Sequence, residues 1–141
     1  APCDLPKPDC FSFEDNRFDI VISTDVFEHI SDPYLAHQEI YRVLKMGGRH
    51  IFTVPFYQTD FLDEVRASMN SKKEILNHKE PLYHIDPLRN GILVFNIFSI
   101  EMLCKLSKIG FRTNMYHLYS PLNGILGSNG VVFEAIKEKR E

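Results

Sequence analysis

Apolar residues run almost without interruption from Phe18 to Thr24, and several of them are β-branched. A run of this kind is typical of a strand buried on both faces, as in a parallel sheet. Further along, apolar residues recur at helical spacing between Asp32-Pro33, a suitable helix start, and Gly47-Gly48, a suitable helix end. His50 to Pro55 is a second β-favouring run. Strand, helix and strand therefore have the spacing of a right-handed parallel crossover, which predicts the α/β class.

The middle of the chain predicts one more helix and a long loop. Between Thr59 and Met69, four apolar residues share one helical face: Phe61, Leu62, Val65 and Met69. Residues 70–90 are mostly polar and contain Pro81 and Pro87, so we expect a surface loop or lid there.

The last third predicts a helix and two strands. Ser99 is a suitable N-cap and Gly110 a suitable terminator, with an inward face made of Ile100, Leu103, Cys104 and Leu106. Phe111 to Tyr119 and Val131 to Lys137 then have the pattern of two strands joined by a long turn, as in an antiparallel pair. We expect residues 1–141 to form a single domain.

Composition narrows the class of protein. With 44% hydrophobic and 25% charged residues, the chain matches ordinary folded proteins. Its net charge is −3 and its basic residues are scattered, so we expect no nucleic-acid partner. No apolar window reaches the length of a membrane span. Three cysteines, an odd number without paired spacing, predict free thiols and a cytoplasmic location: Cys3, Cys10 and Cys104.

The most informative residues are Asp15-Asn16-Arg17-Phe18-Asp19, Phe27-Glu28-His29 and the stretch from Gln38 to Arg49. They resemble class I S-adenosylmethionine-dependent methyltransferases of type 11, in which DNSFD precedes a strand, LEH follows it and REIxRVLKPGGR leads into the next. Met46 replaces the usual proline of the last motif. The resemblance implies the carboxyl-terminal half of such a domain. It implies a partial Rossmann-like sheet, mostly parallel with an antiparallel final pair, and helices on both faces.

Candidate site residues follow the first strand. Ligands of open α/β sheets lie beyond the carboxyl ends of strands, which here means Ser23, Thr24, Asp25 and Val26. Asp25 is the best candidate, because a carboxylate there can accept hydrogen bonds from a hydroxyl or ammonium group or act as a base. The resemblance implies that the cofactor is S-adenosylmethionine, and that these four residues and Asp4, which would contact the adenine amino group, bind it.

His29 joins Asp25 as a catalytic candidate, provided that the loop after the strand turns back toward the same pocket. The alternative is that Glu28 and His29 only cap the following segment or pair with Arg42 at the surface. By resemblance, the methyl acceptor would be bound by residues of the loop and insert after the next strand: Phe56, Tyr57, Tyr83 and His84.

We predict no metal site. His78, Glu80, His84 and Asp86 offer suitable donors, but no helical or hairpin pair in the predicted structure sets them at ligand spacing. A hydrogen-bonded loop is the expected role of this segment.

The family's glycine-rich cofactor loop, which follows a strand and opens a helix, has no counterpart before Asp4. Gly124 to Gly130 precedes a strand instead, and is expected to form a turn. We therefore predict methyl transfer that requires a missing amino-terminal half, to an unidentified acceptor that is a small molecule or of unknown kind. The alternatives are a non-catalytic binding or scaffolding module, or an unrelated α/β module that binds another small molecule at the end of its sheet. Without a neighbouring strand, residues 19–24 would also present an apolar edge through which the chain could form a homo-oligomer.

Overall fold

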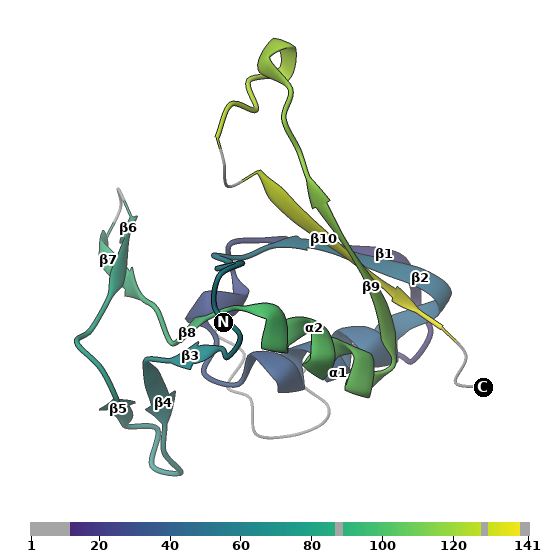
Figure 1. The fold of residues 1–141 in the computed structure, drawn as a ribbon. Helices are drawn as coiled ribbons and strands as arrows, with labels where there is room; N and C mark the ends of the chain where they lie inside the picture. The colour runs from purple at the N-terminus through teal and green to yellow at the C-terminus, as the bar shows by residue number, and fades with distance from the viewer. Residues whose placement is uncertain (1–11, 87–88, 128–129, 139–141) are drawn as a thin grey trace.

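The computed structural model describes residues 12–86, 89–127 and 130–138 of the 141-residue chain (Figure 1). Asp4 therefore lies outside the described residues. The elements in chain order are β1 (Phe18–Thr24), η1 (Phe27–His29), α1 (Pro33–Val43), β2 (Leu44–Thr53), β3 (Glu64–Val65), β4 (Ala67–Met69), β5 (Ile75–Asn77), β6 (Tyr83–Asp86), β7 (Arg89–Leu93), β8 (Asn96–Ile97), α2 (Ile100–Ile109), β9 (Phe111–His117), η2 (Pro121–Asn123) and β10 (Val131–Lys137).

The main sheet has the strand order β1-β2-β10-β9. β1 and β2 are parallel, whereas β10 runs antiparallel to both β2 and β9. The α/β class and the antiparallel final pair are thus confirmed. The expectation of a mostly parallel sheet is wrong for the described strands, because β10 inserts between two parallel strands and reverses both of its pairings.

Both helices lie on the same face of the sheet, below it in Figure 1, and pack against each other. Their buried residues share one core with Phe52 of β2 and Phe133 of β10. On the other face, Ile20 and Ile22 are 53% and 68% exposed. The expectation of helices on both faces is therefore wrong for the described residues. The chain moves from β1 to β2 to β9 in one direction across the sheet, so right-handed crossovers place both helices on one side.

Helix α1 begins as predicted, because the Asp32 side chain accepts a hydrogen bond from the Leu35 amide at 3.0 Å. It ends at Val43, four residues before the predicted Gly47. Fully buried Leu44 pairs with Phe18 in the sheet, and the next paired residue is Arg49 opposite Ile20. Tertiary pairing thus ends the helix early, and the intervening residues bulge outward.

Residues 59–69 do not form the predicted helix. The carbonyls of Asp60 and Phe61 accept hydrogen bonds from the Ile100 and Glu101 amides, at 3.5 and 2.9 Å. The segment therefore caps the amino terminus of α2, whose first amides have no partner within their own helix. The short strands β3 and β4 follow in place of helical turns.

Helix α2 itself has the predicted bounds, with Gly110 at its end in a left-handed conformation (φ 120°). Its inward face differs from the prediction: Met102 and Leu106 are fully buried, whereas Cys104 is exposed. Ser99 occupies the N-cap position, but its hydroxyl donates to Phe61 O and to Asp63 rather than capping the helix.

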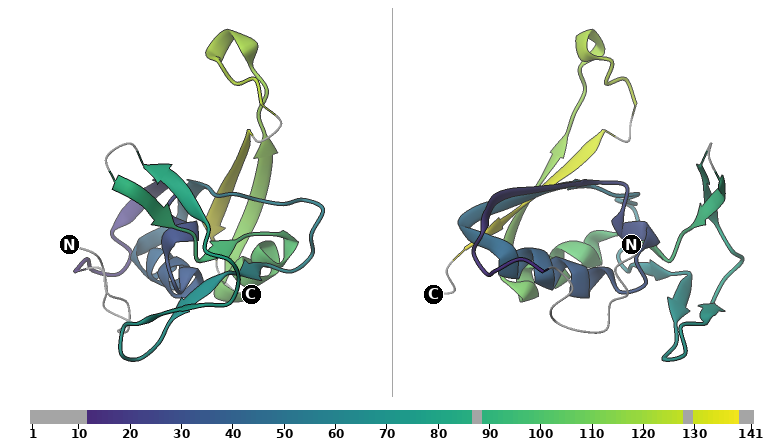
Figure 2. Two further views of the ribbon diagram at one scale, coloured as in Figure 1. Left: turned by 90° about the vertical axis from the view of Figure 1, so that its left-hand side faces the viewer. Right: turned by 180° about the vertical axis from the view of Figure 1, so that it is seen from behind.

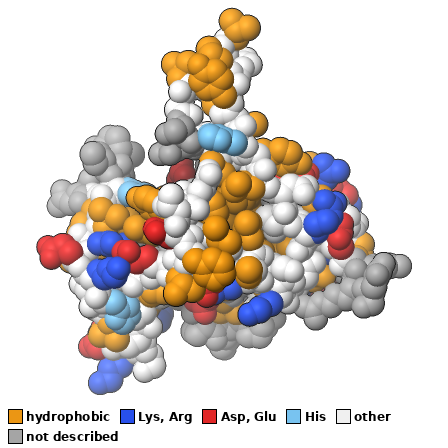
Figure 3. Space-filling view, in the orientation of Figure 1, with side chains coloured by type: hydrophobic (Ala, Val, Ile, Leu, Met, Phe, Trp, Pro, Cys, Tyr) orange, Lys and Arg blue, Asp and Glu red, His pale blue; other side chains and the backbone are white. Residues whose placement is uncertain are grey.

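Two antiparallel hairpins, β4–β5 and β6–β7, occupy much of the predicted loop and extend away from the main sheet (Figure 2). A second extension, between β9 and β10, carries hydrophobic side chains at its tip (Figure 3), among them the fully exposed Leu122. A lid role for residues 70–90 stays a prediction. Neither helix in the described part of the chain is long and apolar enough to span a bilayer.

Candidate functional site

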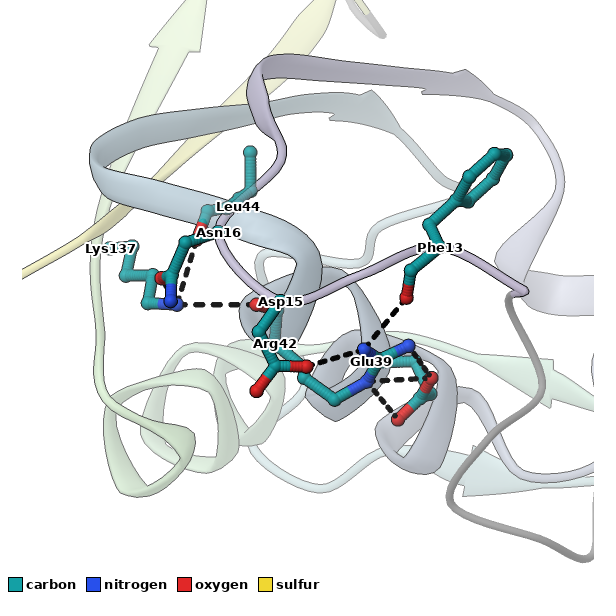
Figure 4. A network of polar contacts seen from close by, with 7 residues as sticks. All are labelled: Phe13, Asp15, Asn16, Glu39, Arg42, Leu44 and Lys137. Carbon is teal, nitrogen blue, oxygen red and sulfur yellow. Dashed lines mark hydrogen bonds and ion pairs between the residues drawn. The ribbon is translucent and has the colours of Figure 1, made fainter.

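The first and last family-like motifs meet at the amino end of β1 (Figure 4). Arg42 donates to Asp15 at 2.6 Å and to Phe13 O at 2.9 Å, and it pairs with Glu39 at 3.0 Å. The carboxylates of Glu39 and Asp15 raise the pKa of Arg42 and hold it charged. Asn16 adopts a left-handed conformation (φ 55°) and its amide donates to Arg42 O at 3.0 Å. These hydrogen bonds and ion pairs hold the amino end of β1 in place, so their role is structural.

Lys137 of β10 adds further hydrogen bonds at the same end of β1. Its ammonium group donates to Asn16 Oδ1 at 2.9 Å and to the Leu44 carbonyl at 2.7 Å. The alternative pairing of Glu28 and His29 with Arg42 is not found among the ion pairs of the described residues, because Arg42 binds carboxylates at this end.

Asp25 lies at the opposite, carboxyl end of β1. Its backbone is left-handed (φ 49°), and its amide donates to Thr53 O, the last residue of β2, at 3.2 Å. The Thr53 hydroxyl in turn donates to the Asp25 carboxylate at 3.2 Å. Two neighbouring parallel strands thus hold one exposed carboxylate at their carboxyl ends. The location is the one expected for Asp25, and its role stays a prediction.

The other predicted cofactor residues of this turn face different ways. The Ser23 hydroxyl lies 2.9 Å from Nε2 of buried His50 and is directed toward the core. Burial lowers the pKa of His50 to about 3, so this imidazole is neutral. Thr24 and Val26 are exposed beside Asp25.

A second buried histidine lies beneath η1. The His37 ring stacks on Phe27 with 4.0 Å between centroids. Burial and the neighbouring His50 lower its pKa well below the ordinary value. Both core histidines are therefore neutral packing residues under the site.

The side chains of Glu28, His29 and His84 lie close to one another. Glu28 Oε1 lies 3.6 Å from His29 Nε2 and 3.5 Å from His84 Nδ1, and the two imidazoles meet edge to face with 5.0 Å between ring centroids. Glu28 is fully buried, His29 is partly buried and the His84 side chain is 40% exposed. His29 thus lies against Glu28 and His84 rather than Arg42, and its catalytic role beside Asp25 stays a prediction.

Hydrogen bonds join residues 28–30 to the end of β7 and the residues that follow it. The Phe95 amide donates to Glu28 O at 2.7 Å, and the Asn96 side-chain amide donates to Ile30 O at 2.8 Å. Between them, His29 Nδ1 donates to Leu93 O at 2.8 Å. Since a carbonyl only accepts, Nδ1 carries a proton in this contact, and Nε2 is the ring nitrogen that lies toward Glu28.

Burial raises the pKa of Glu28, and the neighbouring Asp25 carboxylate raises it further, against the lowering effects of its own backbone amide and of His29. Neither carboxylate oxygen has a hydrogen-bond partner among the residues that the structure describes. A buried acid in this state needs a proton, a cation or a ligand donor as its counterpart.

The four predicted acceptor residues differ in their surroundings, and their role stays a prediction. Phe56 packs against Phe133 of the core, with 5.0 Å between ring centroids. Tyr57 is exposed and lines a cavity of about 310 Å³ together with Glu64, Arg66 and five other residues, whose lining includes neither His29 nor His84. Tyr83 is exposed next to His84 on β6.

Sequence reasoning noted Glu28 but did not place it in the site. The metal prediction also considered the wrong neighbours for His84: His78 instead lies 2.8 Å from the Ser68 hydroxyl, on another hairpin. Among the described residues, the one set of three or more metal-ligating side chains with their ligand atoms within 4.8 Å of one another is Glu28, His29 and His84. No local pattern could have found it, because His84 is far from Glu28 in the sequence.

Residues 5–52 match the family model described as "Methyltransferase domain". A 44-residue stretch is 43% identical to phosphoethanolamine N-methyltransferase 2 of Caenorhabditis elegans, covering 31% of this chain and 10% of that protein. The chain thus spans only a small part of the curated relative it matches.

Solved structures share the fold over nearly the whole chain. An S-adenosylmethionine-dependent methyltransferase from Mesorhizobium loti matches 93% of this chain and 67% of its own, with a TM-score of 0.56 and 13% identity. Phosphoethanolamine N-methyltransferase 2 of Haemonchus contortus, in complex with phosphomonomethylethanolamine and S-adenosylhomocysteine, matches 94% and 36%, with a TM-score of 0.51 and 16% identity. In two further solved structures, the match with this chain covers 60% and 66% of the length of the matched protein. Residues 5–52 are thus similar in sequence to a methyltransferase domain, and nearly the whole chain has the fold of solved S-adenosylmethionine-dependent methyltransferases.

Proposed function

We propose that this protein transfers the methyl group of S-adenosylmethionine to a small nucleophilic acceptor, with the cofactor bound at the carboxyl end of β1. The observation that carries the proposal is the Asp25 carboxylate, exposed and held by Thr53 where two parallel strands end. Ligands of open α/β sheets bind at such ends. A carboxylate there suits the hydroxyl and ammonium groups of the cofactor.

When bound, S-adenosylmethionine supplies an electrophilic methyl group. Asp25 would orient the cofactor by accepting hydrogen bonds, and His29 would line the part of the site where the acceptor is bound. Holding nucleophile and methyl in line supplies much of the rate in such a reaction. The fit is partial, because no glycine-rich loop opens a helix in this sequence. We propose that binding requires such a loop from a further part of the protein.

The acceptor is proposed only as a small molecule with a nucleophilic atom. The similarity to phosphoethanolamine N-methyltransferase 2 supports an amine, but covers 31% of the chain. A cytoplasmic location is proposed from the odd cysteine count. The rival function is a binding or scaffolding module that retains the fold without catalysis.

Calorimetric titration with S-adenosylmethionine and S-adenosylhomocysteine tests the proposal, on this chain and on any longer natural form. Asp25→Asn keeps an amide that tolerates the left-handed backbone but removes the charge, and should weaken binding by about 10-fold to 100-fold. Asp19→Asn is the matched control: it removes an exposed carboxylate from the other end of the same strand, paired with Lys45 at 2.7 Å.

Binding that Asp25→Asn weakens and Asp19→Asn leaves within twofold supports the proposal. Equal effects of the two variants would overturn the site. If no form of the protein binds either compound, methyl transfer is excluded and the scaffolding module is the better account.

A further inference from the structure

We propose that Glu28, His29 and His84 bind one divalent transition-metal ion, with Zn²⁺ as the best fit. This goes beyond methyl transfer, since the three side chains would hold the ion with or without S-adenosylmethionine.

The first argument is distance. Two ligand atoms on a tetrahedral Zn²⁺, each about 2.0–2.1 Å from the ion, lie about 3.4 Å apart. Glu28 Oε1 lies 3.5 Å from His84 Nδ1 and 3.6 Å from His29 Nε2. All three ligand atoms lie within 4.8 Å of one another. Small side-chain rotations would complete the geometry.

The second argument is the state of His29. A metal ligand must offer an unprotonated ring nitrogen, and ligating histidines commonly donate their other N–H to a backbone carbonyl or carboxylate. His29 Nδ1 already donates to Leu93 O at 2.8 Å, which leaves Nε2 free on the side of Glu28. This contact also prevents the ring from turning away.

The third argument is the buried acid. Glu28 is fully buried, and its two oxygens have no hydrogen-bond partner among the described residues. A cation at the centre of the group would supply the missing counterpart. The nearby Asp25 carboxylate adds negative potential and favours a cation further. Partly exposed His84 provides access from solvent.

The donor set selects the kind of metal. Two imidazoles and one carboxylate suit Zn²⁺ and similar transition metals, whereas Mg²⁺ and Ca²⁺ prefer oxygen ligands alone. Three protein ligands with a fourth position open to water is the pattern of catalytic rather than structural zinc sites.

The test is Zn²⁺ binding by the untagged chain, in competition with a chromophoric chelator and without S-adenosylmethionine. All cysteines are first alkylated, so that their thiols cannot bind the ion. We expect one equivalent to bind with a submicromolar Kd, and His84→Ala to weaken binding at least 100-fold. His78→Ala, which removes another exposed hairpin histidine, is the matched control and should stay within twofold.

A second measurement needs no variant. Imidazole ¹⁵N NMR of the wild-type protein should show the His29 and His84 nitrogens shifting on addition of one equivalent of Zn²⁺, with the other histidines unchanged. Binding below one equivalent, equal loss in both variants or unshifted His29 and His84 resonances would overturn the site. Because cofactor is absent, these outcomes are independent of the calorimetric test of methyl transfer.

Discussion

The two ends of β1 differ in how their polar groups are paired. At the amino end, Asp15, Asn16 and Arg42 are joined by short hydrogen bonds and ion pairs, and Lys137 reaches in from β10. At the carboxyl end, Asp25 is exposed, and the buried carboxylate of Glu28 has no hydrogen-bond partner among the described residues. Satisfied polar groups stabilise a fold, whereas a buried unsatisfied one costs stability and is expected where a ligand will bind. The predictions below test this difference.

The largest effect is expected at the amino end. Arg42→Ala removes the partner of Asp15 and leaves the Glu39 carboxylate, 5% exposed, without its cation. We expect a loss of about 3 kcal/mol in the free energy of unfolding, measured by urea titration. The control Arg49→Ala breaks the pair with Glu134, in which the arginine is 56% exposed, and should cost less than about 1 kcal/mol. Equal losses of unfolding free energy in the two variants would show that the contacts of Arg42 stabilise the fold no more than an exposed ion pair does.

Buried His50, beneath the carboxyl end of β1, should make the stability of the fold depend on pH. The pKa of His50 is about 3 in the folded state, below its ordinary value, so its contribution to stability is complete above about pH 6.5 and is lost as pH falls toward 3. Each such histidine lowers the folding equilibrium constant about tenfold per pH unit in this window.

His50→Leu should therefore flatten the acid limb of stability against pH by one proton, measured by urea titrations at pH 4 to 8. At pH 8 it should be less stable than the wild type by about 1 kcal/mol, because Ser23 loses its partner. In this variant His37, which is also buried with a lowered pKa, still makes stability fall as pH is lowered. An unchanged slope would mean that His50 is not buried and neutral.

At the carboxyl end, one substitution should stabilise the protein. Glu28→Gln replaces the buried carboxyl group, whose pKa is raised by burial, with an amide of nearly the same volume that cannot ionise, and we expect a gain of about 1 kcal/mol in chelator-treated protein. Thermal unfolding in EDTA measures it, with Glu134→Gln, whose carboxylate has several partners, as the contrasting loss. Destabilisation by Glu28→Gln would show that this carboxylate is already satisfied, and would remove the contrast between the two ends.

The smallest effect concerns the strand itself. β1 pairs on one side only within the described sheet, so we propose weak homo-association through residues 19–24. Ile22→Lys changes a side chain that is 68% exposed, so stability should change by less than about 0.5 kcal/mol while association is lost. Sedimentation velocity measures it, with Leu122→Lys at the distant β9–β10 tip as control. A wild type that stays monomeric at high concentration contradicts the proposal.

Local sequence signals were reliable where local forces decide. Asp32-Pro33 predicted the start of α1, Gly110 the end of α2, and the final strand pair was read correctly, because caps, terminators and strand patterns act over a few residues. The predicted helix within residues 59–69 failed for a tertiary reason: its carbonyls bind the first turn of α2 instead.

The sequence by itself determined the α/β class, the family resemblance of residues 13–49 and the position of Asp25 at the end of the first strand. Only the tertiary structure decided that both helices cover one face, and that His84 meets Glu28 and His29. That meeting depends on hydrogen bonds between residues 28–30 and 93–96, far apart along the chain. Contacts of this kind form only when the sheet and its hairpins are assembled, so no local pattern encodes them.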